Sequence, residues 1–155
     1  MDQSTIGHYW YAFLSSLAPN SKYFGKSYIA EGFGDNPSLA EELGQLALRG
    51  IKTATSSALW EWEAEGNPIP QIGSLTIVLD GYAKPICIIE TTEVSVCRFK
   101  DVDEEFAYAE GEGDRSLEYW QKAHTNFFSR VLPKFEKEFS EDMPLVCEHF
   151  RVIYK

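Results

Sequence analysis

The sequence predicts an α+β fold, in which helices surround a small, antiparallel, barrel-like sheet. Three observations predict it. Segments rich in β-branched residues lie in the middle of the chain and at its end. Segments with apolar residues at helical spacing precede and separate them. The chain has 155 residues and no repeat or long linker, so we expect 1–155 to form a single domain.

The first element is a helix over 4–18, where apolar and aromatic residues recur at helical spacing before Pro19. The next segment, 20–35, is rich in glycines and aromatics, and we expect a loop that packs by its aromatic side chains. A second helix is then expected to begin at Asn36-Pro37, because asparagine is a good cap and proline suits the first helical position.

The second helix is expected to end at Arg49, with Gly50 as the left-handed residue that terminates it. A short extended piece, 51–54, follows. Thr55 or Ser56 then caps a predicted third helix that runs to residue 66. This arrangement would place the hydroxyl-rich segment 50–57 at a helix N-terminus, which is a favourable place for an anion.

The middle of the chain is predicted to be β. Segments 74–79 and 86–96 read as strands joined by a turn at Asp80-Gly81, with Pro85 at the start or edge of the second strand. Segment 146–155 reads as a last strand, although its alternation is imperfect.

Between the strands, 101–109 is expected to form a short helix. A longer helix should run from Asp114 or Ser116 to about Lys137, with a break or kink at Pro133.

The net charge of −10 and the pI of about 4.7 disfavour non-specific coating of nucleic acid and docking on anionic membranes. A local basic pocket remains compatible with this charge. We expect no membrane span, because no apolar run is long enough. The N-terminus lacks the basic region of a signal peptide, and Cys87, Cys97 and Cys147 read as free thiols. The sequence therefore predicts a cytoplasmic domain.

The segment GIKTATSS, 50–57, places one lysine among four hydroxyl residues. Lys52 is expected either to be a surface cation or to be partly desolvated beside Ile51 and Ala54. In the second case it could act as a base for the hydroxyl of Thr55. Residues three apart in an extended chain face opposite ways, so this requires the chain to turn between them.

The second notable segment is AEGEGDRSLEYWQKAH, 109–124, in which Glu110, Glu112 and Asp114 alternate with glycines. Crowded carboxylates can raise one carboxyl pKa for acid–base work, or bind a divalent metal. The alternative is a solvated acidic turn in which Asp114 caps the next helix. The sequence contains no histidine pair at metal-ligand spacing, so it does not predict a zinc site.

His124 and Trp120 lie on the apolar stripe of the predicted long helix. We expect His124 to be a hydrogen-bonded core residue, and the alternative is that it is a ligand. Trp120 is expected in the core, with the mouth of a cleft as the alternative. Trp60 and Trp62 cannot share one helix face, so one should be core and the other free to stack on a base.

Together, GIKTAT, the segment FAYAEGEGDRSLEYWQKAH and the final HFRVIY resemble the ASCH domain family, whose fold is a PUA-like β-barrel. The resemblance covers about Phe33 to Lys155 and is closest to stand-alone bacterial members. Residues 1–32 would then be an extension made of a helix and an aromatic loop. The resemblance implies a cleft for a nucleoside or RNA, lined by the lysine segment.

Some short bacterial members of the family that this chain resembles hydrolyse the amide of N-acetylcytidine, and they use a lysine, a threonine and a glutamate to do so. Those residues correspond here to Lys52, Thr55 and Glu112. The short enzymes have an arginine where this chain has Ser57. For Lys52 to act as a base, its pKa must fall well below about 10.4.

Three functions follow from the residues and the resemblance. The first is a hydrolase of an N-acylated nucleoside, without metal or cofactor, in which Lys52 activates Thr55 and Glu112 transfers the proton. The second is an RNA-binding module without chemistry, in which Lys52 and Arg49 contact phosphate. The third is a metal-dependent ribonuclease using the three acidic residues. The remaining residues expected to bind the substrate are Arg49, Thr53, Ser56, Glu110, Asp114, Trp120 and His124.

Overall fold

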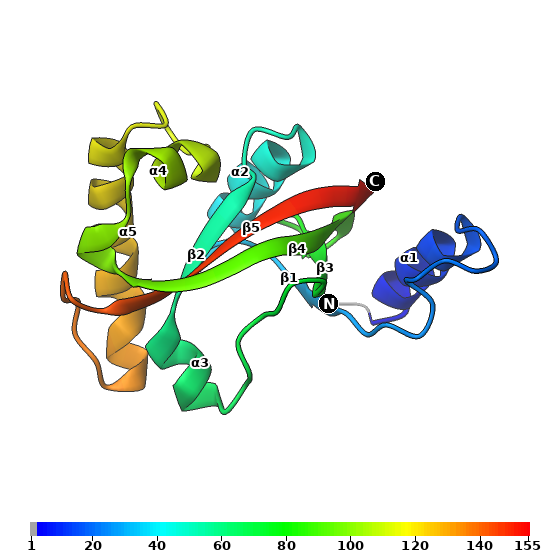
Figure 1. Cartoon of the computed structure of the whole chain (residues 1–155), viewed down its shortest axis with the longest axis horizontal. Coiled ribbons are helices and arrows are strands. Elements are labelled where there is room, and N and C mark those ends of the chain that lie inside the picture. The colour runs from blue at the N-terminus through cyan, green and yellow to red at the C-terminus, as the bar shows by residue number, and fades with distance from the viewer. Residues whose placement is uncertain (1–2) are drawn as a thin grey trace.

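In the computed structural model, which describes residues 3–155, a five-stranded sheet curls into a half-barrel with helices around it (Figure 1). The strand order is β1-β3-β4-β5-β2, and only the pairing of β1 with β3 is parallel. The predicted α+β, PUA-like architecture is thereby confirmed, although the parallel pairing of β1 with β3 departs from the antiparallel sheet that was expected. The strands are β1 (Ile29–Glu31), β2 (Ala54–Ala58), β3 (Leu75–Leu79), β4 (Pro85–Arg98) and β5 (Pro144–Tyr154).

The α-helices begin and end close to the predicted positions, except that the third helix begins later than expected. The cap of the second helix is as expected, since Oδ1 of Asn36 accepts the N–H of Leu39 at 2.9 Å. Gly50 has φ +77°, which agrees with its predicted left-handed role. The α-helices are α1 (Gln3–Ser15), α2 (Pro37–Leu48), α3 (Leu59–Glu65), α4 (Glu104–Glu110) and α5 (Leu117–Val131), and α5 passes into a 3₁₀ turn around Pro133.

Two local predictions are wrong. The segment 20–35 is not only a loop, because it contains β1, which pairs with β3 from Ile29 to Glu31. The third helix begins at Leu59, so Thr55 and Ser56 belong to β2 instead of capping a helix. Pairing with β5 explains the second error, since it satisfies the backbone groups of this segment within the sheet. Lys52 therefore does not lie at a helix N-terminus.

Three apolar clusters hold the helices on the sheet. The first lies under α4 and α5 and includes Trp120, Phe128 and Leu145. In the second, α1 packs Phe13 against β3 and β4, and in the third α2 packs on the sheet near Phe150. Figure 1 shows the pair α4–α5 at one end of the sheet and α1 at the other. The N-terminal segment is thus an integral part of the packed structure.

The three cysteines are free thiols, as predicted. Cys97 on β4 and Cys147 on β5 bring their sulfur atoms to 3.4 Å, and burial raises the pKa of Cys147 strongly. No helix within residues 3–155 is long and apolar enough to cross a bilayer.

Candidate active site

The two segments that the sequence singles out lie against one another at one end of β2. The amide of Thr53 donates to the carbonyl of Ala109 at 2.8 Å. Gly111 has φ +76°, and a Cβ on it would lie 2.6 Å from the carbonyl oxygen of Ile51. Arg115 donates from Nη2 to the same carbonyl at 3.3 Å. The contact therefore requires a residue without a side chain at position 111.

Lys52 is buried at the centre of this contact, with only 1% of its side chain exposed. Its ammonium group donates to Oε1 of Glu110 at 2.9 Å and to Oε2 of Glu112 at 3.1 Å. A weaker contact of 3.4 Å reaches the carbonyl of Glu110. The ammonium also lies 5.2 Å from the ring centroid of Phe33, a cation–π distance. All three donors of Lys52 are thus directed at carbonyl or carboxylate oxygens.

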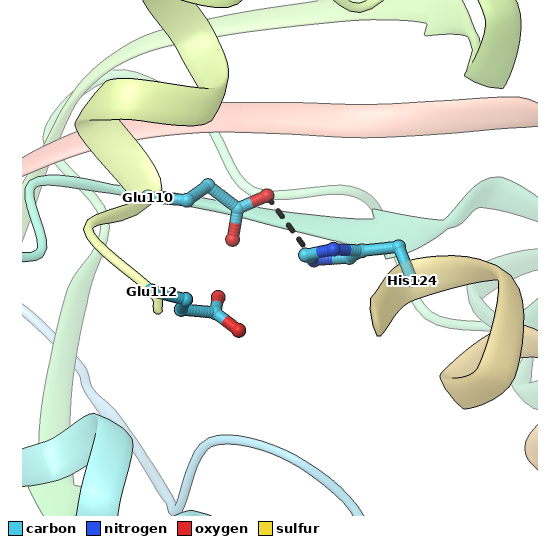
Figure 2. Close-up of side chains that lie close together, drawn as sticks. All are labelled: Glu110, Glu112 and His124. Carbon is cyan, nitrogen blue, oxygen red and sulfur yellow. Dashed lines mark ion pairs between the residues drawn. The ribbon is translucent and has the colours of Figure 1, made fainter. Parts of the chain in front are cut away.

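Glu110, the last residue of α4, holds the other side of the cluster. Its Oε2 accepts from Ser56 Oγ at 2.7 Å and from Trp120 Nε1 at 2.7 Å. Figure 2 shows the carboxylate of Glu110 and the ring of His124 pointing toward one another, and His124 Nε2 lies 3.4 Å from Oε2. With four neighbouring donor groups and 1% exposure, Glu110 is a buried carboxylate with its charge compensated.

The geometry also indicates the charge of His124. Its Nδ1 lies 2.9 Å from the carbonyl of Trp120 and must donate, because a carbonyl can only accept. Its Nε2 faces the carboxylate of Glu110, so a proton on that nitrogen is favoured as well. Burial alone would lower the pKa of His124, but the Glu110 carboxylate outweighs it and the pKa is raised. His124 therefore favours the imidazolium form.

The pKa shifts divide the cluster into fixed charges and one exchangeable proton. Burial would lower the pKa of Lys52, but the two carboxylates outweigh burial and raise it. Burial opposes ionisation of Glu110, yet Lys52 and His124 hold its pKa well below the usual range. For Glu112 burial dominates and the pKa is raised. Glu112 is thus the member of the cluster best able to gain and lose a proton. The lowered pKa that Lys52 would need in order to act as a base is not found.

The cluster forms part of the wall of a cavity of about 400 Å³ between β2, α2 and α5. This volume lies within the range of about 300–1,000 Å³ that is usual for small-molecule sites. At its rim, Arg130 makes a two-point ion pair with Asp35 at 3.0 and 3.1 Å. The residues that line the cavity include Phe33, Leu39, Lys52, Thr55, Ser56, Glu110, Glu112, Tyr119, Lys122, His124, Asn126 and Arg130.

Six of the predicted site residues therefore meet around one cavity: Lys52, Thr55, Ser56, Glu110, Glu112 and His124. Trp120 is buried in the core and reaches the site only through its bond to Glu110, so its predicted core position is confirmed. Asp114 is exposed and accepts the N–H of Ser116 at 2.9 Å. Positive φ angles at Gly113 and Arg115 turn the chain here, and Asp114 does not line the cavity.

Arg49 and Thr53 lie outside this cavity as well. They line a smaller hollow of about 280 Å³ between the end of α2 and the end of β5, together with Arg151 and Lys155. Of the two tryptophans in α3, Trp60 packs against the core under α5, whereas Trp62 donates to Ser57 and lines a different cavity. The two tryptophans therefore take different sides, as predicted, although Trp62 is half-buried and its stacking on a base stays a prediction.

The sequence did not single out Phe33, Asn126, Lys122 or Arg130. The last three lie on one face of α5 at spacings of four residues, so the period of the predicted long helix indicates that they lie together, although not on the face of His124. Phe33 gave no such signal, because its position depends on how the segment before α2 packs on Phe150, where the ring centroids are 6.0 Å apart.

The cluster also contains a possible metal-ligand set. Single ligand atoms of Glu110, Glu112 and His124 lie within 4.8 Å of one another. The ammonium of Lys52, however, is bonded to both carboxylates and supplies the cation that they require. A metal ion would have to replace Lys52, so these residues as arranged do not fit one. Asp114, the third acidic ligand expected for a ribonuclease, is not part of the set.

Comparison with known proteins shows which family has this sequence and this fold. The ASCH domain model matches residues 29–154. The structure of an ASCH domain from Lactobacillus crispatus JV V101 is 41% identical, with a TM-score of 0.93 over 99% of this chain and 96% of that one. Protein EF3133 from Enterococcus faecalis V583 is 34% identical, with a TM-score of 0.87 over 99% and 90% of the two chains.

A third structure, the hypothetical protein PH0355, shares the fold alone, with 17% identity and a TM-score of 0.56 over 82% of this chain and 100% of that one. No curated protein matches the sequence. The family match covers most of the chain, and the similar structures from Lactobacillus and Enterococcus extend over nearly all of it. The chain belongs to the ASCH domain family.

Proposed function

We propose that this protein hydrolyses the amide of an N-acylated, cytidine-like nucleoside. One observation carries the proposal: a buried cluster with two fixed cations, one fixed anion and one proton-exchanging carboxyl forms the wall of a cavity of nucleoside size. Such an environment can hold a developing oxyanion and transfer a proton in the same place. Perturbed carboxyl and lysine pKa values in a cavity are also more frequent at functional sites.

The proposed reaction has two steps. Thr55 Oγ attacks the amide carbonyl while the carboxylate of Glu112 takes its proton, and Lys52 donates a hydrogen bond to the oxyanion. Glu112 then protonates the exocyclic amine, which leaves as cytidine, and the acyl group remains as an ester on Thr55. In the second step Glu112 deprotonates a water that attacks this ester, which releases the carboxylic acid and restores the threonine.

Lys52 has a different role here from the one that the resemblance implies. Its raised pKa and its bonds to two carboxylates keep it an ammonium, so it serves as a hydrogen-bond donor and the proton acceptor is Glu112. Within residues 3–155 the hydroxyl of Thr55 has no hydrogen-bond partner, so it is free to turn toward a ligand. Catalytic hydrogen bonds often shorten only when the substrate binds.

The test is turnover of N-acetylcytidine by the purified protein, followed by chromatography. Glu112→Gln and Thr55→Val should each lower kcat by at least about 100-fold, as expected when an acid–base or nucleophilic group is lost. The matched controls are Glu118→Gln and Thr92→Val, which change the same residue types on the exposed surface. Turnover that survives both site variants, or that EDTA abolishes, contradicts the proposal.

A second candidate is RNA binding without chemistry, since ASCH domains are PUA-like, RNA-binding domains. The observation that favours it is the small hollow beside the cluster. Its described lining residues include no Asp or Glu but four basic residues, Arg49, Lys52, Arg151 and Lys155. If phosphates bind there, the affinity for a short single-stranded RNA should fall steeply with salt, and Arg49→Gln should reduce that slope by about one. A salt-independent affinity contradicts this candidate.

A further inference from the structure

A second cavity, here called the inner chamber, is lined by residues from all five strands and has a volume of about 320 Å³. Its floor is apolar and is formed by Val78 on β3 and Ile89 on β4, both buried. Trp62 and Ile69 cover one side. Neither the proposed hydrolysis nor the hollow near Arg49 uses this chamber. It is nevertheless large enough for a small-molecule group by the usual range of about 300–1,000 Å³.

The inner chamber adjoins the candidate active site through two shared residues. Phe33 and Thr55 line both cavities. Thr55 lies directly opposite Glu148 in the β2–β5 ladder, so its side chain is on the face of Glu148 and the chamber. Ser56 lies opposite Cys147 and faces the other way, toward Glu110. Thr55, the residue proposed as nucleophile, therefore belongs to the walls of both cavities.

The polar groups of the inner chamber differ from those of the active site. Of the residues that line it, all within the described part of the chain, none is Lys, Arg or His. Two carboxyl groups face it instead, those of Glu31 and Glu148. Glu148 accepts a hydrogen bond from Thr91 at 3.2 Å, and burial raises the pKa of Glu148 to about 7. These carboxyl groups disfavour binding of an anion such as a phosphate. Together with the apolar floor, they make the chamber complementary to an aliphatic group that ends in a cation.

We propose that the substrate extends on both sides of Thr55: the nucleobase occupies the active-site cavity, and an acyl chain with a terminal ammonium group occupies the inner chamber. An acetyl group, with a single methyl beyond the carbonyl, would leave most of the chamber unfilled. This inference rests on the proposed hydrolase function and specifies its acyl group. Glu148 is a positioning residue for that group, because it touches the distal end and not the reacting carbonyl.

The test compares four N-acylcytidines that differ only in the acyl group: acetyl, hexanoyl, ω-aminopentanoyl, which matches hexanoyl in length, and glutaryl, which ends in a carboxylate. We expect kcat/KM to be highest for aminopentanoyl, by about tenfold over hexanoyl, and lowest among the long chains for glutaryl. In Glu148→Gln the ratio of aminopentanoyl to hexanoyl should fall to near one, mainly through KM. Glu118→Gln should keep the wild-type ratio.

The outcomes separate the two proposals. Turnover of acetylcytidine without a preference among the long chains overturns the inference and leaves the hydrolase function standing. If no acylcytidine is hydrolysed, the hydrolase proposal fails. Binding of pentylammonium alone then tests whether the inner chamber is a cation site. Binding of pentylammonium that shifts the indole N–H resonance of Trp62, and is lost in Glu148→Gln, supports a cation site there. No shift in the wild-type protein overturns it.

Discussion

The ammonium nitrogen of Lys52 lies 2.9 Å from a carboxylate oxygen of Glu110, and each side chain is only 1% exposed. Two charges removed from water in this way are tolerated only when they compensate one another. The pair joins β2 and α4, which the chain separates by more than fifty residues. It is therefore both the electrostatic centre of the candidate site and a tie between distant segments.

Removing Lys52 should destabilise the protein strongly. Lys52→Met leaves the buried charge of Glu110 with less compensation, and we expect the free energy of unfolding to fall by about 3–5 kcal/mol. Urea denaturation measures this change. The exposed Lys84→Met serves as the control and should have almost no effect. Adding Glu110→Gln to Lys52→Met should recover part of the loss; a double variant less stable than the single one contradicts this interpretation.

Gly111 should tolerate alanine less well than another left-handed glycine of the chain. A Cβ at Gly111 would lie 2.6 Å from the Ile51 carbonyl, whereas one at Gly66, with a similar φ of +69°, meets nothing within 4 Å. Gly66→Ala should therefore cost only the backbone strain, about 1–2 kcal/mol. Gly111→Ala should cost more and also lower turnover, because it moves Glu112 away from Lys52. Equal melting temperatures for the two variants would argue against the close contact.

Stability should depend on pH through Glu148. Its pKa is raised in the folded state from 4.5 to about 7, so the folded protein binds more protons than the unfolded chain between these values. The stability contributed by the protonated carboxyl is complete below pH 4.5 and is lost as the pH rises through about 7. Glu148→Gln removes this loss and keeps an acceptor for Thr91.

We therefore expect Glu148→Gln to be more stable than the wild type by about 3 kcal/mol near pH 8, and no more stable near pH 4.5. Urea unfolding at the two pH values measures the difference. Glu118→Gln, at an exposed position, should follow the wild type at both. A pH-independent effect of Glu148→Gln would show that its cause is packing and not ionisation.

Lys52 should also determine whether the cluster binds metal. Without its ammonium, Glu110, Glu112 and His124 offer ligand atoms within 4.8 Å of one another. Zinc should thus raise the melting temperature of Lys52→Met, because a ligand that binds only the folded state stabilises it. It should not raise that of the wild type, nor that of Lys52→Met combined with Glu112→Gln. Zinc stabilisation of the wild type would show that Lys52 does not exclude the ion.

Much of the fold could be predicted from local signals. Asn36-Pro37, Gly50 and Ser116 mark helix ends through their own backbone and side-chain chemistry, and the structure places them there. The β-branched content of 86–96 sufficed to predict most of β4. These predictions succeed because capping and strand preference depend on neighbours a few residues away.

The errors occur where a distant partner decides. Thr55 and Ser56 carry an acceptable helix-cap signal, but the opposite residues of β5, Glu148 and Cys147, draw them into the sheet. The same holds for 29–31, which becomes a strand only through β3. Local preference is worth less than about 1 kcal/mol per residue, so strand pairing and burial override it.

The sequence by itself determined which residue types are present for chemistry: a lysine among hydroxyls, and carboxylates separated by glycines that permit close approach. Only the tertiary structure decided which of them meet. It joined Lys52 to Glu110 and Glu112, added His124 and left Asp114 in solvent. It also decided the protonation states, because the pKa of a buried group depends on burial and on charges from other segments, which no local pattern specifies.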